Sequence, residues 1–199
     1  MKSLKCLMIF FVLVAESAFA SVAFVGVENS KYAVAGIKPG ENFGLAIRHS
    51  LWVQDASQYV CLSPFYSFHL SKNISGQYSA FYGTTYERTY YDYGADLYLS
   101  ATFFSRLVEF DGRFRPQYDS DLKFNYGYEL VGKAFAGNEI SVFGGIKNIP
   151  EFRKAEDRFL AGMSFSVKNL SVSPEISIPT SLETQYTRVH VNFLYELSF

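Results

Sequence analysis

The end of the chain alternates apolar and polar side chains up to the final residue. Over residues 189–199 every second side chain is apolar, in the order Val189, Val191, Phe193, Tyr195, Leu197 and Phe199. The opposite face carries Arg188, His190, Asn192 and Glu196. Because successive side chains of a β-strand point to opposite faces, this segment must lie between an apolar environment and a wet one.

The apolar face of this last strand also carries large aromatic rings, which are typical of membrane barrels. In Phe193, Tyr195, Leu197 and the terminal Phe199, the chain resembles bacterial outer-membrane β-barrel proteins. The final strand of those proteins ends in phenylalanine after aromatic or aliphatic residues at alternate positions. The resemblance covers one strand and implies a superfamily. It further implies that these four residues form a signal for the barrel-assembly machinery, and that outer-membrane lipid surrounds the protein.

The beginning of the chain has the pattern of a secretory signal. Lys2 and Lys5 precede an apolar run over residues 6–15, and Ala18 and Ala20 supply the small residues before a cleavage site. We therefore expect a signal peptide at 1–20, a single barrel domain at 21–199 and an outer-membrane location. The apolar run is too short to cross a bilayer as a helix, so any later span must be built from strands.

Composition excludes several classes of function. Removal of the leader takes Cys6 away and leaves Cys61 alone, so no internal disulfide is expected and Cys61 is read as a small strand side chain. The net charge of -1 gives no electrostatic reason to expect a nucleic-acid partner. No histidine or cysteine spacing predicts a metal, and no cofactor is expected.

Alternation of period two recurs in about twelve segments along the chain, most clearly over residues 91–103. This predicts an all-β protein, a closed antiparallel up-and-down transmembrane barrel. We expect twelve strands, or ten or eight if the short opening pair at 22–27 and 32–37, or another short pair, lies outside the barrel. A secreted β-sandwich is the alternative, but its outward face should be polar.

The connections between these segments are expected to alternate in length. With the first strand starting in the periplasm, tight turns fall near Lys38, Ser71, Phe104–Ser105 and Lys168. The opposite set contains the longer connections 83–89, 148–156 and 179–184. Short turns inside and longer loops outside are the outer-membrane arrangement. The segment 131–138 is an exception, because it is expected to be a periplasmic turn of loop length.

If the apolar set faces lipid, the other set lines the lumen. The expected lumen residues are Arg48, Asp92, Asp96, Glu109, Asp111, Arg113, Arg115, Lys123, Glu129, Arg158, Glu175, Arg188, His190 and Glu196. Charges inside a barrel are costly unless they are paired or wet. A two-residue turn at Phe104–Ser105 places Asp96 opposite Arg113, and a slip by one residue places it opposite Arg115. Either register predicts an ion pair for Asp96.

Strand direction sorts these charges by depth. Most of the arginines fall in the outer halves of their strands and most of the carboxylates in the inner halves, with Asp92 as an exception. A basic outer constriction would draw anionic solutes inward, whereas the same charges could instead cross-link a filled barrel. The arrangement is similar to small channels that pass acidic sugars. We expect a narrow, porin-like passive channel for small polar or anionic solutes, with a closed structural or surface-binding barrel as the alternative.

Catalysis is not expected. A lipid hydrolase needs a histidine beside a serine nucleophile. His49 falls in the lipid-facing phase and His69 lies near a periplasmic turn, which leaves His190 as the one plausible catalytic histidine. The histidine-serine motifs of the outer-membrane phospholipase, the lipid A deacylase and the omptin proteases are absent from the sequence. His190 is therefore expected to be a hydrogen-bonding residue of the lumen.

Overall fold

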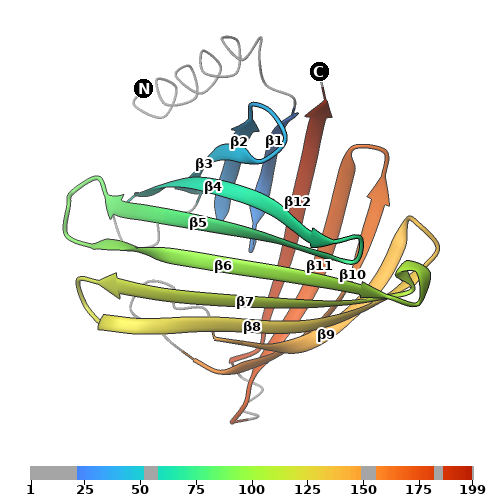
Figure 1. Ribbon diagram of the computed structural model, residues 1–199. Coiled ribbons are helices and arrows are strands. Elements are labelled where there is room, and N and C mark those ends of the chain that lie inside the picture. Colours follow the sequence, from blue (N-terminus) through green and yellow to red (C-terminus); the bar gives the residue numbers. More distant parts are fainter. Residues whose placement is uncertain (1–21, 52–57, 149–155, 182–185, 199) are drawn as a thin grey trace.

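The structure is a computed structural model that describes residues 22–51, 58–148, 156–181 and 186–198. Within these ranges twelve antiparallel strands form one closed barrel, and strands that are consecutive in sequence are neighbours in the sheet (Figure 1). The strands are β1 (Val22–Glu28), β2 (Tyr32–Lys38), β3 (Phe43–Ser50), β4 (Tyr59–Ser71), β5 (Ile74–Thr85), β6 (Tyr91–Phe103), β7 (Val108–Asp119), β8 (Lys123–Ala136), β9 (Ile140–Asn148), β10 (Arg158–Val167), β11 (Leu170–Pro179) and β12 (Arg188–Ser198). The predicted fold class and the count of twelve, opening pair included, are confirmed.

The barrel closes where the first strand pairs with the last. In the register of β1 and β12, Val22 lies opposite Ser198 and Val27 lies opposite Phe193. The strong alternation of the final strand thus provides one side of the closing seam. The expected leader, residues 1–20, and the terminal Phe199 lie outside the described residues. Among those described, no helix is long and apolar enough to cross a membrane.

The two faces of the sheet differ in polarity as the alternation predicts. Along β6, Tyr93, Leu97 and Leu99 are exposed on the outer surface, while Asp92 and Ser100 are buried on the inner face. On β12, Val189 is 71% exposed, whereas the adjacent His190 is buried. Large apolar side chains exposed outside, with charges inside, are the reverse of a soluble protein and suit a barrel surrounded by lipid.

The two ends of the barrel carry different connections. We call the end at which β1 begins the turn end, and its connections are residues 39–42, 72–73, 104–107, 137–139 and 168–169. We call the opposite end the loop end, and its connections are residues 29–31, 51–58, 86–90, 120–122, 149–157 and 180–187. Two loop-end connections, 29–31 and 120–122, are as short as turns. The expected difference in length therefore holds on average and not at each position.

The structure corrects the expectation of a long turn at 131–138. Strand β8 continues to Ala136 and β9 begins at Ile140, so the connection is a tight turn with Gly137 at a φ of 80°. The apolar alternation of β8 is interrupted by Gly132, which lies opposite Gly144 of β9. A glycine pair keeps the backbone in the ladder without adding apolar side chains, so the strand continues where its sequence pattern fades.

The turn between β6 and β7 is also longer than two residues. Phe103 pairs with Val108, which leaves residues 104–107 in the connection, and Phe104–Arg106 form a short 3-10 turn. Phe104, Ser105 and Arg106 all have positive φ. The register of this hairpin is therefore slipped by one residue from that of a two-residue turn, so that Asp96 faces the position of Arg115.

Candidate functional site

The interior of the barrel holds a cavity of about 690 Å³. Its lining comes from inward-facing side chains around the barrel, from Val34 of β2 to Asn192 of β12, and reaches the turn end at Asn138 and Glu139. Polar and apolar groups share the lining. A cavity of this size has room for many water molecules or for one small solute.

An ion pair between β6 and β7 forms part of the charged wall of this cavity. Nε of Arg113 donates to both carboxylate oxygens of Asp96, at 2.8 and 2.9 Å, and Nη2 donates to Oδ2 at 2.5 Å. Arg115 lies farther away, with its Nη1 at 4.0 Å from Asp96 Oδ2. The ion pair predicted for Asp96 is confirmed, and Arg113 is its partner. The close two-sided contact fixes the guanidinium against the wall.

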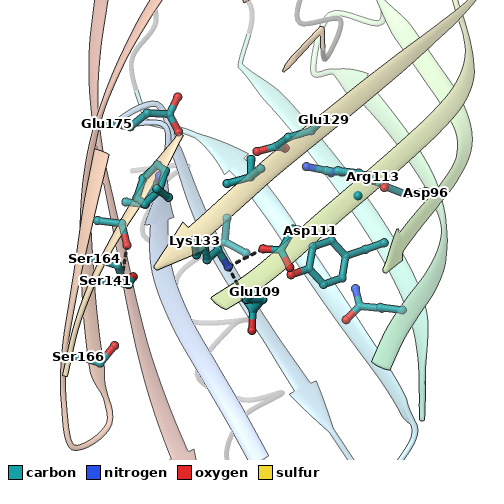
Figure 2. Close-up of a pocket in the computed structure, with 18 of the residues that line it drawn as sticks. Asp96, Glu109, Asp111, Arg113, Glu129, Lys133, Ser141, Ser164, Ser166 and Glu175 are labelled. Carbon is teal, nitrogen blue, oxygen red and sulfur yellow. Dashed lines mark hydrogen bonds and ion pairs between the residues drawn. The ribbon is translucent and has the colours of Figure 1, made fainter. Parts of the chain in front are cut away.

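A second charged group lies nearer the turn end of the same wall. Lys133 of β8 reaches Glu109 Oε1 at 2.8 Å and Asp111 Oδ2 at 2.5 Å, both on β7 (Figure 2). The ammonium group is therefore shared between two carboxylates. Asp111 Oδ1 is buried and has no partner in the described part of the chain. This group is anionic overall.

The opposite wall is lined by hydroxyl groups. Ser164 and Ser166 of β10 form hydrogen bonds of 2.8 Å with Ser173 and Ser171 of β11, respectively. Ser141 of β9 is buried beside them. In Figure 2 the serines lie on one side of the cavity and Asp96 and Arg113 on the other. A solute inside the cavity therefore meets charged groups on one wall and neutral donors and acceptors on the other.

Further ion pairs lie toward the loop end among the described residues, including a looser contact of 4.0 Å between Arg188 of β12 and Glu156. Arg48 of β3 contacts Glu28 of β1 at 2.6 Å. Lys147 of β9 pairs with Glu175 of β11, and Arg158 of β10 pairs with Glu156. The loop-end half is therefore not purely basic, because carboxylates accompany its cations. The lumen residues expected from the sequence, which were sorted by depth, included neither Glu28 nor Lys147.

Aromatic side chains fill the lumen near the loop end, along β2 to β6. The aromatic cluster, as we call it, consists of Tyr32, Tyr59, Cys61, Phe81 and Tyr90, all buried. The ring of Tyr59 lies 6.2 Å from those of Tyr32 and Tyr90, and its hydroxyl donates to Asp92 Oδ1 at 2.8 Å. Burial, together with the nearby charges of Asp92 and Asp119, raises the pKa of Tyr90, so this phenol stays neutral.

The expected lumen residues separate into two groups in the structure. Those that line the cavity are Arg48, Asp96, Glu109, Asp111, Arg113, Arg115, Glu129 and Glu175. The others share the inward face but lie away from the cavity lining, namely Asp92, Lys123, Arg158, Arg188, His190 and Glu196. Asp92, Arg158 and His190 are buried near the loop end, whereas Glu196 is exposed near the turn end.

Two lumen cations were missed from the sequence. Lys133 lies on the same face of β8 as Glu129, but from the sequence this strand was expected to end before Lys133. Lys147 follows the outward-facing Ile146 and so belongs to the inward set, yet its position beside the expected loop concealed it. Extending the two-residue period by two more positions identifies both residues.

The histidines and the cysteine have structural partners. Nδ1 of His190 lies 3.0 Å from the backbone oxygen of Asn29, and Nε2 of His49 lies 3.0 Å from the hydroxyl of Tyr86 on the outer surface. Cys61 is a free thiol, 1% exposed, within the aromatic cluster. Among the described residues no group of three or more His, Cys, Asp or Glu side chains could hold a metal ion.

No protein-family model matches the chain, and no curated protein sequence is significantly similar to it. Solved structures do share its fold. A KdgM porin in complex with disordered oligogalacturonate has a TM-score of 0.64 at 14% sequence identity, covering 89% of this chain and 98% of the porin. A second KdgM porin structure gives a TM-score of 0.63 at the same identity and coverage. A NanC porin has a TM-score of 0.51 at 10% identity, with the same coverage. The chain thus has the fold of these porins.

Proposed function

We propose that the protein is an outer-membrane channel, porin-like and passive, for small polar or anionic solutes. The observation that carries this proposal is the polar cavity of about 690 Å³ inside a closed barrel whose outer surface is apolar. In a filled barrel side chains would occupy this space, whereas a diffusion pathway requires the space to be open. The turn end would face the periplasm and the loop end the outside.

Arginine side chains give the cavity groups that can bind anions. Arg48, Arg113 and Arg115 all line it. A planar guanidinium binds carboxylate groups well, and an anionic solute could pass from one arginine to the next. One of the porins with this fold was solved with oligogalacturonate, an acidic oligosaccharide. That ligand belongs to the other protein, and it supports including anionic sugars among the solutes to be tested here.

The final strand supports the proposed location. Phe193, Tyr195 and Leu197 point outward at the seam that closes the barrel. We propose that the barrel-assembly machinery recognises this strand after a leader at 1–20 has been removed, and that outer-membrane lipid then covers these side chains.

A closed barrel with a structural or surface-binding role is the second candidate, and the aromatic cluster favours it. Tyr59 and Tyr90 are buried near the loop end, where Asp119 and Ser177 are also almost fully buried. If these side chains close the loop end, the cavity is a vestibule open to one side only.

Planar-bilayer recording of the purified full chain tests the channel. Insertion is verified first, by heat-modifiable migration on gels and by protease protection in vesicles. Discrete conductance steps then support the channel. Silence over many verified insertions, together with no swelling of proteoliposomes in a neutral sugar, contradicts it and favours the closed barrel.

A further inference from the structure

We infer that the cavity binds zwitterionic solutes, with an anionic group held at Arg115 and an ammonium group held at Glu129. This inference deepens the proposed channel function, because it names the class of solute that the pathway prefers. It rests on two side chains of opposite charge that line the same cavity and are not fully paired by the protein.

Glu129 is a carboxylate between two cations, each of which forms an ion pair with another carboxylate. In the sheet register it lies opposite Arg113 of β7 and opposite Lys147 of β9. Arg113 is bonded to Asp96, and Lys147 is paired with Glu175. Within the described part of the chain, Glu129 itself has neither a hydrogen bond nor an ion pair. A carboxylate in this position attracts a cationic group from the cavity.

Arg115 is the complementary group. It is only 6% exposed, and its Nε is buried without a hydrogen-bond partner among the described residues. Its guanidinium lies 4.0 Å from the centre of the Phe81 ring, and its contact with Asp96 is a distant one of 4.0 Å. A buried guanidinium with a free N–H donor is an anion-binding group.

The register brings the two groups to a distance that one small molecule can bridge. Arg115 lies opposite Gly127, and Glu129 is two residues farther along β8. Such diagonal neighbours on one face of a sheet have Cα atoms about 7–8 Å apart. An ω-amino acid with a few methylene groups has charges separated by a comparable distance.

The charge balance of the cavity favours a zwitterionic solute over a purely anionic one. Among the described residues its lining contains four cations, Arg48, Arg113, Arg115 and Lys133, and six carboxylates, Asp96, Glu109, Asp111, Glu129, Glu139 and Glu175. The paired cations are largely neutralised by their partners. A solute that brings its own ammonium group gains from the surplus of negative charge, and a simple anion lacks this second contribution.

Three probes of similar size test the inference. γ-Aminobutyrate carries both charges, butyrate lacks the ammonium group and butylammonium lacks the carboxylate. Binding to the purified full chain in detergent is measured by titration calorimetry, and block of open-channel current is measured in bilayers. We expect γ-aminobutyrate to bind at concentrations at which the other two do not. Glu129→Gln and Arg115→Gln should each weaken its binding by about 10-fold or more, the loss of one charged partner.

Two further variants control for indirect effects. Glu41→Gln removes a carboxylate from the turn-end connection 39–42, outside the cavity lining, and should leave binding unchanged. Arg115→Lys keeps the positive charge and should retain part of the binding. This variant keeps the test informative even where Arg115→Gln impairs folding. Equal binding of butyrate, equal binding of butylammonium, or full binding by Glu129→Gln each overturns the inference. Binding without conductance would instead reject the channel and leave the zwitterion site in place.

Discussion

Asp96 and Arg113 form a close ion pair although the register of β6 and β7 places Arg115, and not Arg113, opposite Asp96. The pair is therefore diagonal. Arg115 lies opposite Asp96 across the ladder, but its Nη1 is 4.0 Å from Asp96 Oδ2 and its guanidinium packs on the Phe81 ring. One carboxylate thus accompanies two guanidinium groups on the cavity wall, and its loss leaves both without a close counter-charge.

Replacement of Asp96 by Asn should lower stability and raise anion permeability. Removing the carboxylate leaves Arg113 without its partner, at a cost of about 1.5–3 kcal/mol. Unfolding in urea, followed by tryptophan fluorescence and by gel mobility, measures the first effect. Reversal potentials in a salt gradient measure the second. The double variant Asp96→Asn with Arg113→Gln should recover part of the stability, and a double variant less stable than the single one would contradict the pair.

Replacement of Gly26 by Ala should weaken the seam that closes the barrel. A Cβ atom at Gly26 falls 2.1 Å from the backbone oxygen of Phe193 on β12, so the backbone itself must shift. We expect a loss of about 1–3 kcal/mol, as for other overpacked sites. The matched control is Gly112→Ala, because its new Cβ meets only the Leu130 side chain at 3.7 Å. Equal stability of the two variants in urea titration would contradict the seam geometry.

An arginine introduced on the outer face should be far more harmful than one introduced inside. Leu97 is exposed on the outer surface in the middle of β6, and Gln77 of the neighbouring strand lines the cavity. Leu97→Arg places a charge in lipid at a cost of about 2–4 kcal/mol. Gln77→Arg places the same charge in a wet lumen. The yield of heat-modifiable protein assembled into vesicles distinguishes them, and similar yields would refute the facing of the strands.

Truncation of Tyr59 should widen the pathway near the loop end. Tyr59→Ala removes a ring that packs between Tyr32 and Tyr90, and single-channel conductance should rise. The cost in stability is about 3–5 kcal/mol, as for other large aromatic truncations. Tyr59→Phe removes the hydroxyl that donates to Asp92 but keeps the ring, and it should keep the conductance of the unmodified chain. Unchanged conductance in Tyr59→Ala would show that the aromatic cluster does not limit flow.

The sequence by itself determined the fold class and the facing of the side chains. Side chains two positions apart lie on the same face of a strand, so the sequence of each strand shows which of its faces is apolar. The strand of residues 189–199 and the segment 91–103 could be assigned in this way, whereas for the short opening pair the sequence left open whether it belongs to the barrel. The presence of an arginine beside Asp96 also followed, because both possible registers supplied one.

Only the tertiary structure decided how long the strands are, which register they take and which charges pair. Gly132 interrupts the pattern of β8, and its continuation to Ala136 depends on pairing with β9. The β6–β7 connection spans residues 104–107 and contains positive φ at Phe104 and Ser105, and no local pattern predicts this length. Arg113 and Lys147 bond to carboxylates on other strands, so Glu129 has no ion-pair partner among the described residues. Such choices depend on residues far apart in the chain, whose competition is settled only when the barrel closes.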